Sequence, residues 1–248
     1  MHTTVPQQST RRQVLRAGFA AAIGSWAAIE VLGAGQASAA PVPPPEVAAG
    51  RISMVGDSLT CGTLPFQADD FSAAGWAHSA IDAYVSRGVR TKIKADRYTG
   101  LTAVDAIREK SGDSLAWIIG LGTNDSVIYS HNKQAEVIAM MMEHIGSDHK
   151  VMWVNVYLPE RLPLQLAWNT ALDEAAQQSN GDMVVLDWAS VAAQNEHWLA
   201  HDHIHYSRDG YRSRSTVIGQ ASRDLRVVES GPQLLAHWKL PARLTKVS

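Results

Sequence analysis

The fold is decided by the stretch RISMVGDSL, residues 51–59. Its apolar first half predicts a short strand over Arg51–Val55, and the Gly-Asp-Ser that follows ends this strand in a loop. In open α/β sheets, ligands bind beside the carboxyl ends of strands, so a serine at this point is a candidate functional residue. The same residues also suit an ordinary turn. The functional interpretation therefore depends on two later stretches, GTND at residues 122–125 and DHIH at residues 202–205.

Apolar runs alternate with helical patterns along the rest of the chain. We predict strands over Arg51–Val55, Thr91–Ala95, Leu115–Leu121, Val151–Tyr157 and Met183–Trp188. We predict helices over Ala73–Ser86, Ala103–Lys110, Gln134–Ile145, Leu164–Gln178 and Asp209–Val227. Alternating strands and helices favour an α/β fold with a parallel sheet covered on both faces. The run AWIIGL at residues 116–121 is apolar throughout, as expected of a central strand.

Composition excludes several classes of function. The chain has 248 residues, of which 46% are hydrophobic, and this length is ample for one core and marginal for two. A net charge of −2 gives no electrostatic case for binding nucleic acid. The single cysteine, Cys61, excludes an intrachain disulfide framework and a cysteine-built zinc site.

The first 39 residues have the pattern of an export signal. TRRQVL at residues 10–15 resembles the twin-arginine motif, and a moderately apolar stretch follows over Ala17–Leu32. Ala37-Ser38-Ala39 then fits the small-residue rule for signal peptidase. A retained membrane anchor is the alternative, but Glu30 and several glycines interrupt the apolar stretch, and a spanning helix needs about twenty apolar residues.

These features predict the organisation of the whole chain. We expect a cleaved signal peptide over residues 1–39, a Pro-rich linker over 40–50, one globular domain over 51–228 and a tail over 229–248. The mature protein is expected in the periplasm, in the cell envelope or outside the cell, with no stable membrane insertion after cleavage. The sequence leaves the oligomeric state open.

Four separated blocks carry a resemblance to a known family. They are GDSL at residues 56–59, Gly100, GTND at 122–125 and DHIH at 202–205, which Gly210-Tyr211 follows. In this order they resemble the SGNH hydrolases, also called the GDSL esterase/lipase family, over roughly Arg51 to Leu225. The resemblance implies a flavodoxin-like three-layer α/β/α sandwich with five parallel strands in the order 2-1-3-4-5.

The chemistry of the blocks agrees with the resemblance. A serine hydroxyl is a weak nucleophile and needs a base within hydrogen-bond reach. A neutral histidine can accept its proton near neutral pH, and a carboxylate on the other ring nitrogen fixes the histidine tautomer. Ser58, His205 and Asp202 can fill these three roles. Such a triad needs no cofactor and no metal.

An acyl-transfer site also needs donors for the oxyanion that forms on the substrate carbonyl. The resemblance implies three donors, which are the backbone N–H of Ser58, the backbone N–H of Gly100 and the side-chain amide of Asn124. Glycine allows the backbone to approach a substrate closely, and a neutral amide donates without adding charge.

The predicted function is a secreted serine esterase that hydrolyses short-chain acyl esters through an acyl-enzyme. Its substrate would be a small-molecule or glycan acyl ester. An O-acyltransferase acting on cell-envelope glycans would use the same triad. A non-catalytic binding module on the same fold is a third interpretation.

A metal-assisted hydrolase is the rival enzyme class. His201, His203 and His205 alternate, His197 lies upstream, and alternating histidines can hold a metal ion. This interpretation leaves Ser58, Gly100 and Asn124 without a role.

Overall fold

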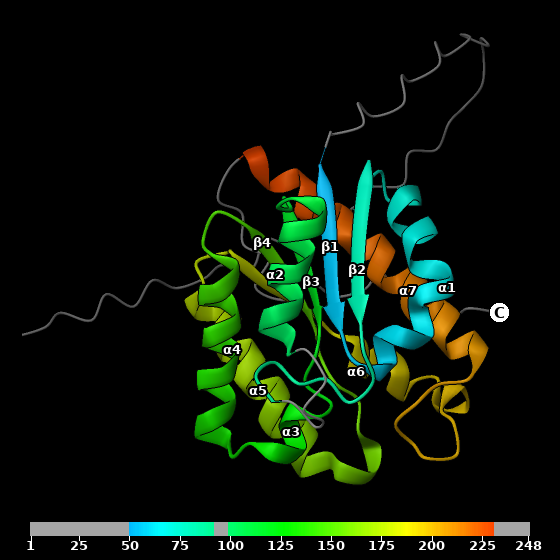
Figure 1. Ribbon diagram of the computed structural model, residues 1–248. Coiled ribbons are helices and arrows are strands. Elements are labelled where there is room, and N and C mark those ends of the chain that lie inside the picture. Colours follow the sequence, from blue (N-terminus) through cyan, green and yellow to red (C-terminus); the bar gives the residue numbers. More distant parts are fainter. Residues whose placement is uncertain (1–49, 92–98, 231–248) are drawn as a thin grey trace, which may run out of the picture. The chain divides into compact units, whose positions relative to one another are not determined.

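The computed structural model describes residues 50–91 and 99–230, and its centre is a five-stranded sheet (Figure 1). All neighbouring strands pair in parallel, in the order β2-β1-β3-β4-β5. This confirms the predicted sheet and its strand order. The strands are β1 (Arg51–Gly56), β2 (His78–Ala83), β3 (Ala116–Gly120), β4 (Lys150–Val154) and β5 (Met183–Leu186).

Helices cover both faces of the sheet, so the fold is the predicted three-layer α/β/α sandwich. One face packs against α1 (Ser58–Ala73), α6 (Trp188–Ala193) and α7 (Arg208–Ser222). The other packs against α2 (Gly100–Ser111), α4 (His131–Ile145) and α5 (Leu162–Gln178). Shorter elements complete the described chain: α3 (Asp125–Ile128), η1 (Pro159–Arg161), η2 (Glu196–Trp198) and η3 (Arg223–Ser230).

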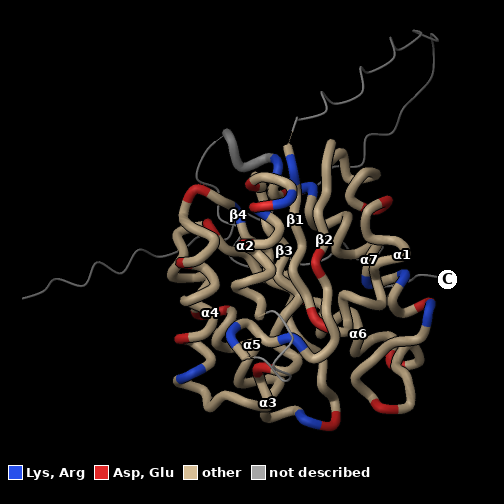
Figure 2. The backbone as a smooth tube through the Cα atoms, in the orientation of Figure 1, with Lys and Arg blue, Asp and Glu red and all other residues tan. Residues whose placement is uncertain are grey.

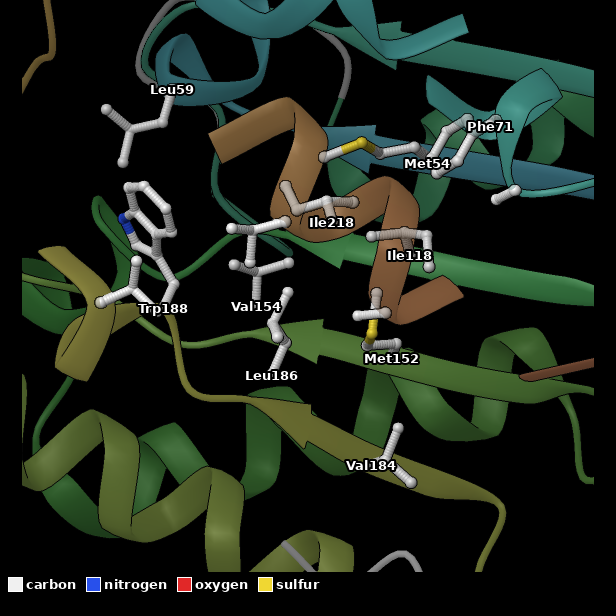
Figure 3. Close-up of a cluster of buried hydrophobic side chains, with 14 of the residues drawn as sticks. Met54, Leu59, Phe71, Ile118, Met152, Val154, Val184, Leu186, Trp188 and Ile218 are labelled. Carbon is white, nitrogen blue, oxygen red and sulfur yellow. The ribbon is translucent and has the colours of Figure 1, made fainter. Parts of the chain in front are cut away.

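Alternation along the strands divides the core into two layers. In β1, Met54 faces the layer beneath α1 and α7, whereas Val55 faces the opposite layer. Figure 3 shows the first layer, in which Met54, Ile118 and Ile218 are fully buried. Each such side chain contributes about 1.5–3 kcal/mol by leaving water. Charged residues of both signs are spread over the helices and loops, while β3 has none (Figure 2).

The second strand is not where the sequence pattern placed it. The helix predicted over Ala73–Ser86 is wrong, because residues 78–83 form β2 along β1. β2 is an edge strand whose side chains are mostly half-buried, so it lacks the continuous apolar run of an inner strand. Of the strand predicted over Thr91–Ala95, Thr91 lies outside any strand and the other residues lie outside the described part of the chain.

Helix α1 was also missed by the sequence pattern. It contains Gly62 and Pro65, residues that ordinarily interrupt a helix. Tertiary packing compensates here, because Gly62 leaves room for the ring of Tyr211 on α7, which approaches its Cα closely. A side chain in place of Gly62 would separate the two helices.

The remaining predicted elements are present with shifted ends. β4 and β5 stop at Val154 and Leu186, earlier than predicted, and the predicted last helix is divided into α7 and η3. The predicted signal peptide and most of the linker and tail lie outside the described residues. Within the described residues, no helix has both the length and the apolar character needed to cross a membrane.

Candidate active site

Two neighbouring strands open a crevice at their carboxyl ends. β1 and β3 are adjacent, yet β1 leads into α1 on one face, whereas β3 leads through α3 to α4 on the other. Such a switch point is where open α/β sheets bind ligands. Ser58 follows β1 directly and Asn124 follows β3, so the sheet brings both residues to this crevice.

Ser58 is held by the start of α1. Asp57 is the N-cap, and its carboxylate accepts a hydrogen bond from the Leu59 N–H at 2.9 Å. Ser58 is therefore the first helical residue, and the helix ladder makes no use of its N–H. Gly56 and Gly120, paired at the strand ends, let Thr60 approach the sheet closely, since a Cβ on either would collide with its Oγ1.

Asp57 is a buried support for this turn. Its side chain is fully buried, and burial raises the pKa of the carboxyl to about 6, although the bond from the Leu59 N–H and the charge of Arg214 act in the opposite direction. Asn124 Nδ2 also approaches Asp57 Oδ2, at 3.4 Å. Asp57 thus joins the loops that follow β1 and β3.

The structure brings Ser58, His205 and Asp202 into one hydrogen-bonded chain. His205 Nδ1 lies 2.6 Å from Asp202 Oδ2, and His205 Nε2 lies 2.9 Å from Ser58 Oγ. A carboxylate can only accept, so Nδ1 carries the proton and Nε2 is free to accept the serine hydroxyl. This is the tautomer that a general base requires.

Asp202 is fixed by its own loop. Its Oδ1 accepts hydrogen bonds from the backbone N–H groups of Ile204 and His205 at 3.1 and 2.9 Å. The side-chain bond from His205, followed by these backbone bonds, holds the pKa of Asp202 well below its usual range. These bonds therefore favour the ionised form of the carboxylate.

The loop that carries His205 is held at its ends by contacts with buried aromatic side chains. Leu199 and Tyr206 form an antiparallel bridge, and the Ala200 N–H donates to the His205 carbonyl at 2.7 Å. Tyr206 packs edge-on against Trp188 and accepts a hydrogen bond from its indole N–H at 2.8 Å. These contacts anchor both ends of the loop to the core.

A cavity of about 410 Å³ opens beside the triad and includes Ser58 and His205 in its wall. Five apolar residues, Val85, Val127, Ile128, Leu158 and Ile204, supply much of the remaining wall.

Asn124 lies in the wall of this cavity, where the sequence predicted an oxyanion donor. Its Nδ2 donates to the Arg87 carbonyl at 2.9 Å, which orients the amide, while its contact to Asp57 is long at 3.4 Å. One N–H of the amide is therefore weakly engaged and can turn toward a substrate oxygen.

Gly100 is not brought to this cavity. It is the first residue of α2, its N–H donates to the Gly88 carbonyl at 2.9 Å, and its Cα packs against Leu121 and Met141. Ser86 lies in the cavity wall instead, on the loop after β2, with a positive φ of 60°. Sequence reasoning would have pointed to Ser86 only if it had placed β2 correctly.

His203 and His197, two of the other histidines near residue 200, make their contacts outside the triad. His203 Nε2 lies 3.6 Å from Glu160 Oε1, and the ring of His197 packs against Trp198. Within residues 50–91 and 99–230, no three His, Cys, Asp or Glu side chains are grouped to hold a metal ion. The geometry thus assigns His205 to Ser58 and gives the alternating histidines no common centre in that part of the chain.

Two further residues near the site were missed by the sequence. Arg161, the last residue of η1, lies in the cavity wall. Arg214 of α7 is fully enclosed, with its guanidinium 5.0 Å above the ring of Trp188 and its charge acting on Asp57. Neither residue belongs to a motif, so only the folded chain reveals them.

Comparison with solved structures agrees with this architecture. The chain resembles the catalytic domain of peptidoglycan O-acetyltransferase A from Streptococcus pneumoniae, with a TM-score of 0.56 and 15% identity over 72% of this chain and 95% of that domain. It resembles Est24, a carbohydrate acetylesterase from Sinorhizobium meliloti, with a TM-score of 0.53 and 15% identity over 73% and 99% of the two chains. A lipolytic G-D-S-L family protein from Veillonella parvula gives the same TM-score and identity over 73% and 98%.

These similarities show that the fold is that of the SGNH hydrolases. Neither a search with models of known protein families nor a search of curated proteins finds a match to the sequence. The chemistry must therefore be argued from the residues of this chain.

Proposed function

We propose that the protein is an exported serine esterase that hydrolyses short-chain acyl esters. The observation that carries the proposal is the hydrogen-bonded chain from Asp202 through His205 to Ser58, which ends at the wall of an open cavity. Serine, histidine and carboxylate in this geometry are the parts that activate a hydroxyl for acyl transfer.

The mechanism follows from the positions of the three side chains. Ser58 Oγ attacks the ester carbonyl while its proton passes to His205 Nε2, and the ionised Asp202 stabilises the imidazolium. The C–O bond to the alcohol then breaks, and the alcohol leaves with the proton from His205. Water attacks the resulting acyl-enzyme in the same way and releases the acid and free Ser58.

Three donors would hold the oxyanion that forms in each step. The Ser58 N–H and the Asn124 amide are those that the sequence suggested, and Ser86 takes the place expected for Gly100 because it lies in the same cavity wall. The positive φ of Ser86 costs about 1–3 kcal/mol in a non-glycine residue, which is the kind of strain that clusters at functional sites.

Nitrophenyl esters of increasing chain length test the activity and its preference. We expect a maximum between acetyl and butyryl, because the cavity has a modest volume of about 410 Å³. Ser58→Ala should abolish turnover while the protein stays folded, since little volume changes. More than a few per cent of residual activity would disprove the serine mechanism, and a maximum at octanoyl or longer would disprove the short-chain preference.

Acyl transfer to a glycan hydroxyl is the second candidate function. The similarity to a peptidoglycan O-acetyltransferase domain favours it, because an acyl-enzyme on Ser58 can be released by a sugar hydroxyl as well as by water. Adding a glycan acceptor at millimolar concentration tests it. Acylated product that forms faster than free acid would make the protein a transferase.

A further experiment distinguishes an enzyme from a non-catalytic binding module on the same fold. A serine-directed phosphonate should modify Ser58 in a reaction that requires His205, because only an activated hydroxyl attacks phosphorus readily. Mass spectrometry of the modified peptide decides the question. An unmodified Ser58 would favour the binding module.

A further inference from the structure

The cavity beside Ser58 has an uneven distribution of charge. Among residues 50–91 and 99–230, no Asp or Glu side chain contributes to its wall, and apart from His205 the only ionisable residue of that part of the chain in the wall is Arg161. The rest of the wall is apolar or carries neutral polar groups, such as Ser86 and Thr123. A neutral short acyl chain offers no anionic group to this guanidinium, whereas a substrate that carries an anion would.

The guanidinium of Arg161 is not neutralised by a neighbour in the part of the chain that the structure describes. The adjacent Glu160 lies toward His203, with 3.6 Å between Oε1 and Nε2. No carboxylate oxygen lies within ion-pair distance of Arg161 among the described residues. Arg161 is therefore available to pair with a ligand.

Arg87 provides an instructive contrast on the loop after β2. Its guanidinium forms an ion pair with Asp82 at 2.7 Å and donates to the carbonyls of Asp82 and Gly56. Its side chain is only 1% exposed, so this arginine is a structural clamp between strands and loop. Arg161 has neither the ion pair nor the burial that would give it such a role.

We propose that Arg161 selects ester substrates that carry a carboxylate. The inference rests on the proposed esterase function and adds a substrate class to it. The planar guanidinium matches a carboxylate in a bidentate pair, and one cation balances one negative charge. While Ser58 holds the ester carbonyl, a carboxylate elsewhere in the same substrate pairs with Arg161 on the wall of the same cavity.

Matched substrates test the preference directly. We would compare 4-acetoxybenzoate with 4-acetoxybenzamide, in which the carboxylate belongs to the alcohol part. The 4-nitrophenyl monoester of adipic acid and its terminal amide place the carboxylate on the acyl part instead. In at least one pair, the wild-type kcat/KM should favour the carboxylate by roughly tenfold, the scale of one charge-assisted contact that is partly open to solvent.

Variants separate the role of Arg161 from a general effect of charge. Arg161→Gln should reduce the preference to about one by lowering kcat/KM for the carboxylate substrate more than for its amide, and Arg161→Lys should keep part of the preference because the charge remains. Arg212→Gln is the matched control, since this exposed arginine packs over Phe66 away from the cavity. The preference should also fall as the salt concentration rises, which a purely structural role would not cause.

Equal rates for carboxylate and amide in both pairs would overturn the proposal, and so would a preference that survives Arg161→Gln. Phosphonate labelling of Ser58 keeps this outcome distinct from a failure of the esterase function. If Ser58 is not labelled and no ester is cleaved, calorimetry still decides the role of Arg161. Tighter binding of 4-hydroxybenzoate than of 4-hydroxybenzamide, lost in Arg161→Gln, would then support it, and equal binding would refute it.

Discussion

Asp125→Asn should make the fold more stable at neutral and alkaline pH. Asp125 is fully buried behind the candidate site, and its Oδ1 accepts the Val89 N–H at 2.9 Å. Burial raises the pKa of this carboxyl from its ordinary 3.8 to about 7, and the nearby charge of Asp57 acts in the same direction. Its Oδ2 has no hydrogen-bond partner among the described residues. The ionised form is therefore the costly one.

The sign and the size of the effect follow from proton linkage. The folded protein holds the Asp125 proton up to about pH 7, whereas the unfolded chain releases it near 3.8, so the native state binds more protons between these values. Stability therefore falls as the pH rises through this window. At ~1.4 kcal/mol per pH unit, the whole difference is at most about 4 kcal/mol.

Asparagine imitates the protonated acid, because it keeps the acceptor for the Val89 N–H and never ionises. Urea unfolding at a series of pH values should give equal stabilities for Asp125→Asn and the wild type near pH 4. A difference that favours the variant should grow to a few kcal/mol above pH 7. Asp69→Asn, at an exposed position of α1, is the control and should show no such growth. A constant difference, or one that favours the wild type at high pH, would refute the reasoning.

Three further predictions concern the site and the predicted export signal. Asn124→Ala should lower kcat by about 10²–10³, the usual scale for one oxyanion donor, and a loss below about fivefold would mean that Asn124 only shapes its turn. His205→Ala should abolish ester cleavage while His203→Ala should be mild, because only His205 reaches the serine; kinetics in the reverse order would reassign the base. Replacing Arg11 and Arg12 together by lysine should hold the precursor in the cytoplasm, as cell fractionation would show, whereas normal export would indicate the general secretory route.

The predicted site residues that the structure brings together share one property. β1 and β3 are inner strands, so each is an apolar run whose end is easily recognised, and the residue that follows lies at the crevice. Ser58 and Asn124 follow such strands, and the family resemblance rests on both of them. The spacing from Asp202 to His205 is a local pattern within one loop, and the structure places these two side chains in direct contact.

Gly100 is not among the residues of the cavity wall, and the reason lies in the placement of the second strand. Because β2 is a half-buried edge strand with Ser79, Ala80 and Asp82, its sequence has no clear β pattern. The resemblance implied a glycine after the second strand, and with that strand expected over Thr91–Ala95 the matching glycine was Gly100. β2 ends at Ala83, twelve residues before the predicted end at Ala95, so the loop that enters the cavity begins correspondingly earlier in the chain and includes Ser86.

The sequence also does not show what holds the loop of His205 in place. The Asp202 and His205 side chains are 51% and 40% exposed, and an exposed pair contributes only about 0–1 kcal/mol toward holding its own geometry. The precision must come from the base of the loop, where Tyr206 is buried against Trp188 and bonded to its indole N–H. The guanidinium of Arg214 lies over the ring of Trp188, and Arg214 is itself fully enclosed. No sequence motif includes Tyr206, Trp188 or Arg214. Their role depends on contacts between the β5–α6 segment, the loop that carries His205, and α7. The catalytic base is therefore positioned by the core of the fold as much as by the residues that would perform the chemistry.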